Sequence, residues 1–265
     1  MTAVPYLCFP EGRLKALTLS YDDGRTQDRR LVELLDRYGL RATFHLNSGK
    51  WDHEGYITRA ETGTLFKNHE ISAHTVNHPF LDRTAPEVWV TEIIEDRRAL
   101  EEVAGYPVRG MSYPFGTYND EVARTLPQLG IRYSRTVHST HSFELPDDPL
   151  RWHPTCHHKE MLTMADKFEE PSWSPKASLF YVWGHSYEFD NDNNWEMMET
   201  FCQRMGDRDD IWYATNIEIL DYMEAARRLQ YSVDRTHVFN PSHQPVWIRI
   251  GDRKHKLSPG LNALT

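Results

Sequence analysis

The sequence predicts an α/β fold, a distorted TIM-like barrel of the (β/α)7–8 kind that ends in a small C-terminal β hairpin. Short strand-type runs alternate with amphipathic helical stretches along most of the chain. The length of 265 residues is one that such barrels commonly fill as a single unit. No Gly/Ser-rich linker and no repeat of fixed period divides the chain. We therefore expect a barrel over residues 1–230 and a β extension over residues 231–265 packed on it.

The first predicted strand carries the residues around which the rest of the chain is organised. Leu17–Ser20 alternates apolar and polar residues, which is typical of a strand, and Asp22, Asp23 and Gly24 follow at its end. Asp-Asp-Gly is also an ordinary strand-to-turn signal. Because neighbouring residues of an extended chain point to opposite sides, we expect different roles for the two aspartates. One could bind a metal while the other accepts a proton.

The remaining elements follow from the same patterns. We predict further strands at Arg41–Leu46, Glu70–His74, Val108–Tyr113, Ile131–Arg135, Ser178–Trp183 and Ile211–Ala214. We predict helices at Thr26–Tyr38, Pro86–Ala104, Asp120–Leu129, Lys159–Phe168, Trp195–Met205 and Asn216–Leu229. The intervening segment 137–154 is expected to be a long loop, and Val246–Ile250 part of the terminal hairpin.

Composition narrows the classes of partner. Apolar residues make up 39% and charged residues 26%, which disfavours disorder. The net charge of −9, without a long basic run, argues against nucleic acid or an anionic membrane as the main partner. The three cysteines lack the spacing of a disulfide framework. No signal peptide or membrane span is recognisable, so we expect a cytoplasmic protein, or a secreted one if a signal peptide precedes this numbering. The oligomeric state stays open.

Several chemically active side chains fall at or just after predicted strand ends. They are Asp22, Asp23, His74, His78 and His185. The carboxyl ends of parallel strands share one face of a barrel, so these residues should converge there. The four-residue spacing of His74 and His78 would bring both rings to one side of a helical turn. Two imidazoles and a carboxylate, with other positions left to water, are typical of a catalytic divalent metal site.

Four motifs carry a resemblance to a known family. Ser20-Tyr-Asp-Asp-Gly24, His74-Thr-Val-Asn-His78, Ser112-Tyr-Pro-Phe-Gly116 and Val182-Trp-Gly-His185 occur in this order. Together they resemble the motifs of the polysaccharide deacetylases, carbohydrate esterase family 4, which carry the NodB homology domain. The resemblance runs from about Ala16 to His185.

The resemblance implies a metal-dependent carbohydrate N-deacetylase with metal-activated water as the nucleophile. Asp23, His74 and His78 would hold one divalent ion, most often zinc, with cobalt or nickel as substitutes. Asp22 would be the general base and His185 the general acid that protonates the leaving amine. The expected substrate is an N-acetylated carbohydrate or a small amide.

The resemblance also implies residues that contact the substrate. Tyr113, Pro114 and Phe115 belong to the third motif, where a backbone N–H near Phe115 would be a second oxyanion donor. The fourth motif is unclear, and Trp152 is its best candidate.

The chain departs from the family pattern at the position that usually holds an arginine beside the catalytic aspartate. That position is Ser112 here. Arg109 is three residues earlier and so on the opposite face of the strand, which makes it a poor substitute.

Other interpretations remain open at this point. The same site could hydrolyse another linear or cyclic amide, or the chain could be a non-catalytic carbohydrate-binding barrel. A glycosidase with paired carboxylates would need a second acid about 5–9.5 Å away, which no sequence feature identifies. His157 and His158 are expected to form a solvated junction between loop and helix. Tyr187, Glu188, Asp190 and Trp195 follow His185, and one or two of them could contact substrate.

Overall fold

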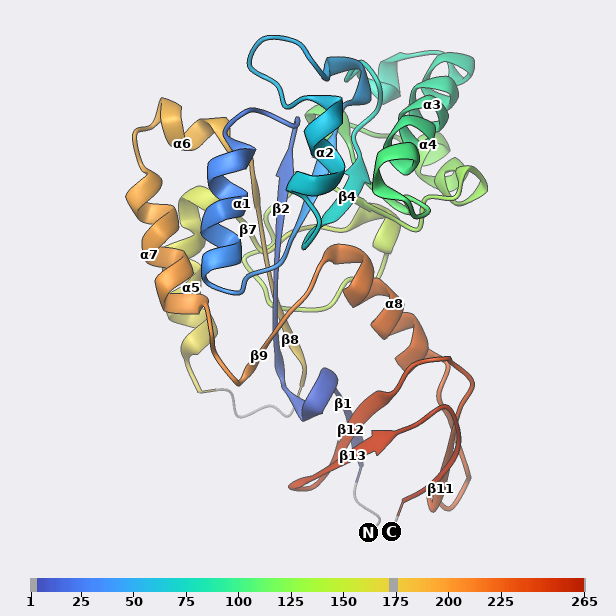
Figure 1. The fold of residues 1–265 in the computed structure, drawn as a ribbon. Coiled ribbons are helices and arrows are strands. Elements are labelled where there is room, and N and C mark those ends of the chain that lie inside the picture. The colour runs from blue at the N-terminus through green and yellow to red at the C-terminus, as the bar shows by residue number, and fades with distance from the viewer. Residues whose placement is uncertain (1–3, 172–175, 265) are drawn as a thin grey trace.

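The computed structural model describes residues 4–171 and 176–264 as a curled parallel sheet with helices on its outside (Figure 1). The order of its hydrogen-bonded strands is β6-β5-β4-β3-β2-β8-β7, and β9 pairs with the start of β2. These strands are β2 (Lys15–Asp22), β3 (Ala42–Leu46), β4 (Glu70–Ala73), β5 (Gly110–Ser112), β6 (Tyr133–Arg135), β7 (Cys156–His157), β8 (Ser178–Gly184) and β9 (Ile211–Tyr213). A parallel bridge between Arg135 and Trp152 connects β6 with the segment that leads into β7. This bridge brings the two sheet edges together and confirms the predicted TIM-like barrel.

Helices alternate with these strands as the sequence predicts. They are α1 (Asp28–Arg37), α2 (Arg59–Leu65), α3 (Pro86–Ala104), α4 (Asp120–Thr125), α5 (Met161–Glu169), α6 (Tyr187–Asn191), α7 (Trp195–Met205) and α8 (Asn216–Arg227). Single 3-10 turns occur at Pro10–Gly12, Ser48–Lys50, Leu81–Arg83, Pro114–Gly116, Leu126–Leu129, Pro149–Arg151 and His158–Glu160. The helices α2 and α6, both of which are short, were not predicted from the sequence. A capping box between Thr58 and Glu61 starts α2 and was the readable signal for it.

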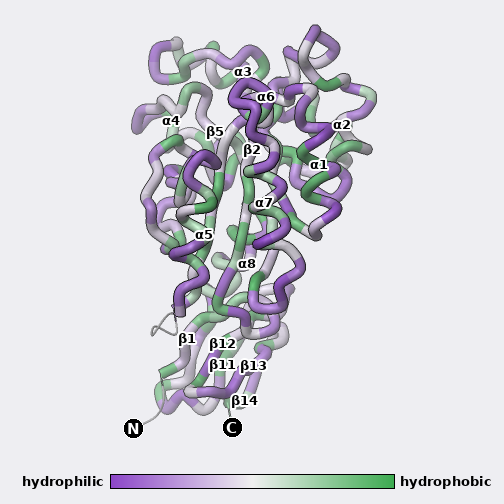
Figure 2. Tube along the Cα trace, turned by 90° about the vertical axis from the view of Figure 1, so that its left-hand side faces the viewer, coloured by the Kyte–Doolittle hydropathy of each residue, from purple (hydrophilic) through white to green (hydrophobic). Residues whose placement is uncertain are grey.

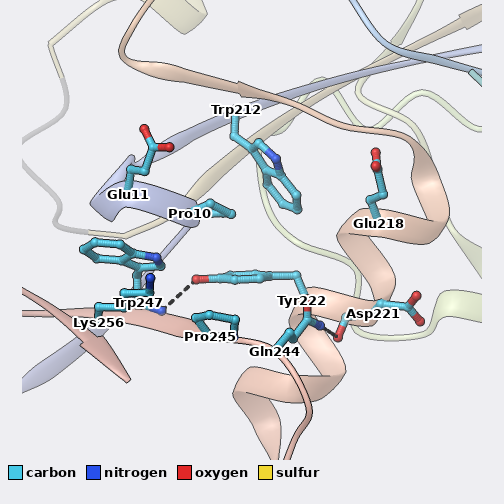
Figure 3. A pocket seen from close by; sticks show the side chains of 10 residues that line it. All are labelled: Pro10, Glu11, Trp212, Glu218, Asp221, Tyr222, Gln244, Pro245, Trp247 and Lys256. Carbon is cyan, nitrogen blue, oxygen red and sulfur yellow. Dashed lines mark hydrogen bonds between the residues drawn. The ribbon is translucent and has the colours of Figure 1, made fainter. Parts of the chain in front are cut away.

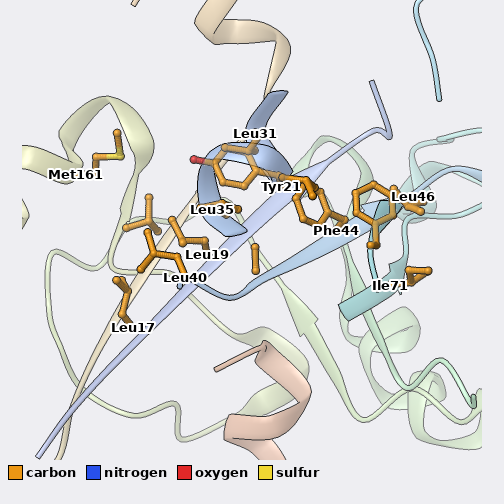
Figure 4. Close-up of a cluster of buried hydrophobic side chains, with 14 of the residues drawn as sticks. Leu17, Leu19, Tyr21, Leu31, Leu35, Leu40, Phe44, Leu46, Ile71 and Met161 are labelled. Atoms are coloured by element: carbon orange, nitrogen blue, oxygen red, sulfur yellow. The ribbon is translucent and has the colours of Figure 1, made fainter. Parts of the chain in front are cut away.

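The hydrophobic core lies between the strands and the surrounding helices. Leu17, Leu19 and Tyr21 of β2 point outward, where α1 covers them with Leu31 and Leu35 (Figure 4). Figure 2 shows hydrophobic stretches along the central strands, while the outer helices alternate between hydrophilic and hydrophobic. The period-2 pattern of β2 thus faces a helix layer outside and the barrel lumen inside.

The barrel lumen is filled by polar side chains that bond to one another. Thr18, the inward neighbour of the core leucines, donates to Asn216 Oδ1 over 2.9 Å. Glu70 of β4 accepts hydrogen bonds from Thr43 Oγ1 at 2.8 Å, from the Tyr133 hydroxyl at 2.8 Å and from the backbone N–H of Ile217 at 3.0 Å. Burial raises the pKa of Glu70 to about 7. The lumen therefore holds titratable groups away from water.

The C-terminal part is larger than the predicted hairpin. The hairpin of β12 (Val246–Ile250) and β13 (Arg253–Leu257) exists, but β1 (Pro5–Cys8) pairs antiparallel with β12 and makes a three-stranded sheet. A second three-stranded sheet contains β10 (Gln230–Tyr231), β11 (His237–Asn240) and β14 (Gly260–Ala263). The predicted hairpin is thus present, and the added pairing of β1 with β12 spans almost the whole chain, which local sequence patterns do not reveal.

The two C-terminal sheets lie below the barrel in Figure 1, at the end where β2 begins. The division at residue 230 stays a prediction, although β1 joins the strands that this division assigns to the extension. Within residues 4–171 and 176–264, no helix combines the length and the apolar character needed to cross a membrane.

The buried Glu70 should make stability depend on pH. Its pKa is raised on folding from 4.5 to about 7, so the folded state binds the proton more tightly than the unfolded chain. The unfolding free energy should therefore fall as pH rises from about 4.5 to about 7, because ionisation costs more inside the barrel. Glu70→Gln should flatten this decline and, above the folded pKa, make the protein more stable than wild type by up to about 3 kcal/mol.

Urea unfolding between pH 5 and pH 8 measures this difference. The exposed Glu87→Gln on α3 serves as the control and should follow the wild-type curve. A Glu70→Gln curve parallel to that of wild type would contradict the assignment.

Candidate active site

The two aspartates at the end of β2 point to different places because the strand ends between them. Asp22 is the last residue of β2 and, like Thr18 and Ser20, faces the lumen, where it is 3% exposed. Asp23 has a positive φ of 80°, and its N–H donates to the carbonyl of His45 over 3.0 Å. This left-handed turn directs the Asp23 carboxylate towards the two histidines after β4.

His74 and His78 lie in an irregular loop, so the prediction of a helical turn was wrong. Thr75 and His78 have positive φ values of 68° and 62°, which a helix does not allow. The loop is held by Asn47, whose Nδ2 donates to the carbonyl oxygens of His74 and Thr75 at 2.5 and 2.9 Å. The two rings still meet, with centroids 4.6 Å apart.

His74 is fixed with a defined nitrogen towards Asp23. Its Nδ1 lies 2.9 Å from the carbonyl oxygen of Ser112, which can only accept a hydrogen bond. The proton is therefore on Nδ1, and Nε2 presents a lone pair. The buried carboxylate of Asp96 on α3 holds the backbone, since Oδ2 accepts from the N–H of His74 over 3.0 Å.

Asp23, His74 and His78 have the geometry of a candidate metal site. The Oδ1 atom of Asp23 lies 3.7 Å from Nε2 of His74 and 3.7 Å from Nε2 of His78. The three donor atoms all lie within 4.8 Å of one another. Burial lowers the pKa of both histidines, so the imidazoles are neutral at neutral pH. Neutral imidazole and carboxylate are ligands that suit zinc and related divalent ions, and the site fits such an ion.

A buried arginine that the sequence analysis did not identify pairs with Asp22. The side chain of Arg135, at the end of β6, is fully buried, and its Nη2 donates to Asp22 Oδ2. The Oγ atom of Ser112 donates to the other carboxylate oxygen over 3.2 Å. Burial alone would raise the pKa of Asp22, but the Arg135 guanidinium outweighs it and holds the pKa well below its usual range. Arg135 thus reaches Asp22 from the strand next to the one that carries Ser112.

His185 directly follows β8 and is paired with a carboxylate. Its Nδ1 lies 2.6 Å from Glu188 Oε1, a hydrogen-bond distance. Burial alone would lower the pKa of His185, but the hydrogen bond to Glu188 and the charges of Asp22 and Asp23 outweigh it and raise the pKa. The ring can therefore carry a proton beside the two aspartates.

The surroundings of Glu188 correct a second expectation. His158 is completely buried, so the predicted solvated junction was wrong for this residue. Nε2 atoms of His157 and His158 each lie 3.4 Å from Glu188 Oε2. These contacts fix the carboxylate that in turn fixes His185. Glu188 is three residues after His185, a spacing that could have indicated the pair once a short helix was recognised there.

The predicted substrate contacts divide into exposed and buried residues. Phe115 is 51% exposed at the rim, and its ring lies 4.3 Å from that of His78 and 3.8 Å from Phe80, on which it stacks. Tyr113 and Trp152 are each 1% exposed, and Pro114 is also buried. The Tyr113 hydroxyl donates to the carbonyl of Leu150 over 2.7 Å. Of the predicted set, Phe115 alone offers a free ring to a ligand, and Phe80 joins it.

A separate cavity lies at the other end of the barrel, between α8 and the sheet of β1, β12 and β13 (Figure 3). It measures about 410 Å³ and is lined by Trp212, Trp247 and Tyr222 together with polar side chains. The Tyr222 hydroxyl bonds to the carbonyl of Cys8 at 2.6 Å and accepts from the N–H of Trp247 at 2.9 Å. This cavity lies between the barrel and the C-terminal sheets, remote from the carboxyl ends of the barrel strands.

Comparison with known proteins agrees with the resemblance that the first three motifs carry. The sequence model of the family described as polysaccharide deacetylase matches residues 10–134. The peptidoglycan-N-acetylglucosamine deacetylase of Bacillus cereus is 26% identical over 140 residues, which are 52% of this chain and 61% of that protein. The chain spans about half the length of the curated relatives that it matches, from 45% to 61%.

Two solved structures share the fold. One is a candidate polysaccharide deacetylase of Mycobacterium smegmatis, with a TM-score of 0.62 and 17% identity, covering 86% of this chain and 96% of that one. Another is a family 4 carbohydrate-esterase pseudoenzyme of Bacillus anthracis, with a TM-score of 0.52 and 17% identity, covering 81% of this chain and 68% of that one. In its barrel fold, its motif order and the match over residues 10–134, the chain is similar to the polysaccharide deacetylases.

Proposed function

We propose that the protein is a metal-dependent hydrolase that removes the acetyl group from an N-acetylated amino sugar. The observation that carries the proposal is the convergence of Asp23, His74 and His78 next to the buried carboxylate of Asp22. The Nε2 atom of His74 lies 3.7 Å from Asp23 Oδ1 and 3.9 Å from Asp22 Oδ2, so ligand set and base share one space. The name of the Bacillus cereus relative supports an N-acetylglucosamine substrate.

A divalent ion held by Asp23, His74 and His78 would supply Lewis acidity, which acidifies water and polarises an amide carbonyl. Asp22 accepts the proton of the attacking water. Its pairing with Arg135 keeps the carboxylate ionised, and the hydrogen bond from Ser112 fixes its orientation. Asp22 is therefore ionised at neutral pH. Its low pKa makes it a weak base when no ion is bound beside it to acidify the water.

His185 supplies the proton that the leaving nitrogen needs. Its raised pKa keeps a larger fraction protonated at neutral pH, and Glu188 fixes the ring through Nδ1. The left-handed residue Phe115, with φ of 58°, donates no backbone hydrogen bond to residues 4–171 or 176–264. Its N–H is thus available to an oxyanion at the rim, as the resemblance of the third motif implies.

Acetate release tests the proposal directly. Zinc-loaded protein should release acetate from N-acetylglucosamine oligomers, and chelator should abolish the release, because the ion supplies the Lewis acidity. Asp22→Asn should lower kcat by about 10²–10⁴-fold, since the side-chain amide of asparagine cannot accept the proton of the attacking water. Enzymatic acetate detection measures both effects.

The same assay separates the other interpretations. Release from small acetamides but not from sugars would favour hydrolysis of another amide. New reducing ends without acetate would point to a glycosidase. Sugar binding by metal-free protein, without turnover of any amide, would favour a non-catalytic barrel like the Bacillus anthracis pseudoenzyme.

Metal content gives a measurement that does not depend on turnover. We expect about one zinc, cobalt or nickel ion per chain after reconstitution, and less than a tenth of that in His74→Ala, which removes a ligand from a small set. Asp22→Asn should keep the ion, because Asp22 pairs with Arg135 and accepts a hydrogen bond from Ser112 and is not among the three proposed ligands. Elemental analysis after gel filtration checks this. Equal metal content in wild type and His74→Ala would contradict the ligand assignment.

The pairing of Asp22 with Arg135 should contribute to the free energy of unfolding. Arg135→Met leaves a buried carboxylate without its partner and should lower the unfolding free energy by about 3–5 kcal/mol. The double variant Asp22→Asn/Arg135→Met removes both charges and should recover much of this loss, without recovering activity.

Arg109→Met is the matched control, because it breaks the half-exposed pair with Asp221. Its cost should be about 1 kcal/mol or less. Urea unfolding at neutral pH compares the variants. A loss in Arg135→Met no greater than that in Arg109→Met would show that the buried pair does not matter for stability.

A further inference from the structure

Arg25 occupies a fixed position one residue beyond the motif that carries both aspartates. Gly24 accepts a hydrogen bond from the N–H of Ile57 over 3.0 Å, and the N–H of Thr26 donates to the carbonyl of Gly55 over 3.1 Å. Arg25 itself forms an antiparallel bridge with Tyr56. The backbone on both sides of Arg25 is therefore tied to the loop before α2, close to the metal ligand Asp23.

The guanidinium of Arg25 is held by aromatic rings on two sides. Its central carbon lies 4.4 Å from the ring centroid of Tyr56 and 5.3 Å from that of Tyr187. Rings placed in this way stabilise a cation over their faces and leave its hydrogen-bonding edge free. Their two elements, the loop before α2 and the start of α6, come from distant parts of the chain.

The hydrogen bonds of this guanidinium are unused within residues 4–171 and 176–264. Its Nε is buried and has no hydrogen-bond partner there, and no carboxylate of those residues forms an ion pair with it. Neighbouring arginines behave differently, since Arg29 pairs with Glu61, and Arg135 pairs with Asp22. A guanidinium fork matches a carboxylate with two parallel hydrogen bonds.

Arg25 is also next to the residues proposed for catalysis. The Tyr187 ring that covers it lies 5.2 Å, centroid to centroid, from the ring of His185. Phe80 and Phe115 present their stacked rings beside His78. The surroundings of the site therefore combine two stacked aromatic rings with a guanidinium that has no ion-pair partner among residues 4–171 and 176–264.

We propose that Arg25 binds a carboxylate of the substrate, so that the site prefers N-acetylated compounds that carry an acidic group. This inference rests on the proposed function and specifies the substrate class of the same site. Two sources share the chemistry, an amino sugar with a carboxylate substituent and an N-acetylated amino acid. The net charge of −9 strengthens the argument, because the many carboxylates within residues 4–171 and 176–264 include none that forms an ion pair with this guanidinium.

Matched substrate pairs test the proposal. N-acetylmuramic acid and its methyl ester differ at the carboxylate alone, where the ester adds a methyl group and removes the charge. N-acetyl-L-alanine and its methyl ester form the second arm. For zinc-loaded wild type, kcat/KM for the acid of one pair should exceed that for its ester by about tenfold or more, as a charge-assisted pair allows. The arm that shows the preference identifies the source of the carboxylate.

Substitution of Arg25 should remove the preference for the acid over the ester. In Arg25→Gln, kcat/KM for the acid should fall to that for the ester, while Arg25→Lys should keep part of the difference. Arg30→Gln is the matched control, because Arg30 also lies over an aromatic ring, that of Trp195 at 4.4 Å, on the outside of α1. It should retain the wild-type ratio.

If Arg25 acted only through its interaction with Asp23, and not on the substrate carboxylate, the result would differ. In that case Arg25→Gln would lower kcat/KM for acid and ester by the same factor, and the inference would be wrong. An acid-to-ester ratio near unity in wild type would overturn it as well.

Binding measured without turnover separates this inference from the proposed function. Calorimetry with zinc-loaded Asp22→Asn should show tighter binding of the preferred acid than of its ester, and Asp22→Asn/Arg25→Gln should show no difference. If wild type released no acetate from any compound, the proposed function would fail, yet this binding comparison would still decide the role of Arg25. Equal binding of acid and ester to Asp22→Asn would refute it.

Discussion

The ion pair between Asp22 and Arg135 is the constraint on which the upper half of the barrel depends. Both side chains are removed from water, so each charge would be costly without the other. The lumen completes the pair, because Arg135 Nε donates to Ser20 Oγ at 3.1 Å and Nη1 donates to the carbonyl of Thr136 at 3.0 Å. Trp183 covers the guanidinium, with its ring centroid 4.5 Å away. These contacts require β2, β6 and β8 to meet in one register.

That register also sets what each neighbouring residue can do. Ser112 contacts both His74 and Asp22, since its carbonyl accepts from His74 Nδ1, its Oγ lies 2.7 Å from the same nitrogen, and its hydroxyl donates to Asp22. The small side chain at this position leaves room for Arg135 to approach from the next strand. Asp23 leaves the strand in a left-handed turn and faces His74 and His78 instead of the lumen. Asp22 and Asp23 are thus adjacent in sequence but differ in surroundings.

The titratable groups around the site differ in charge because their surroundings differ. Asp22 is kept ionised by a fixed cation, and the two candidate ligand histidines are kept neutral by burial. His185 is kept more basic by Glu188, which His157 and His158 support from the loop before α5. Arg25 differs from these groups, because its buried Nε has no hydrogen-bond partner among residues 4–171 and 176–264. This difference is what makes it informative about a ligand.

The sequence by itself determined the strand–helix order, the barrel and the set of Asp22, Asp23, His74, His78 and His185 at strand ends, because hydrophobic periodicity and parallel strands carry that information locally. Only the tertiary structure decided that Arg135 pairs with Asp22 beside Ser112, and that Trp152 lies in the core. Such outcomes depend on which strands become neighbours when the sheet curls closed, and on side chains that meet across more than a hundred residues. No local pattern encodes those distances.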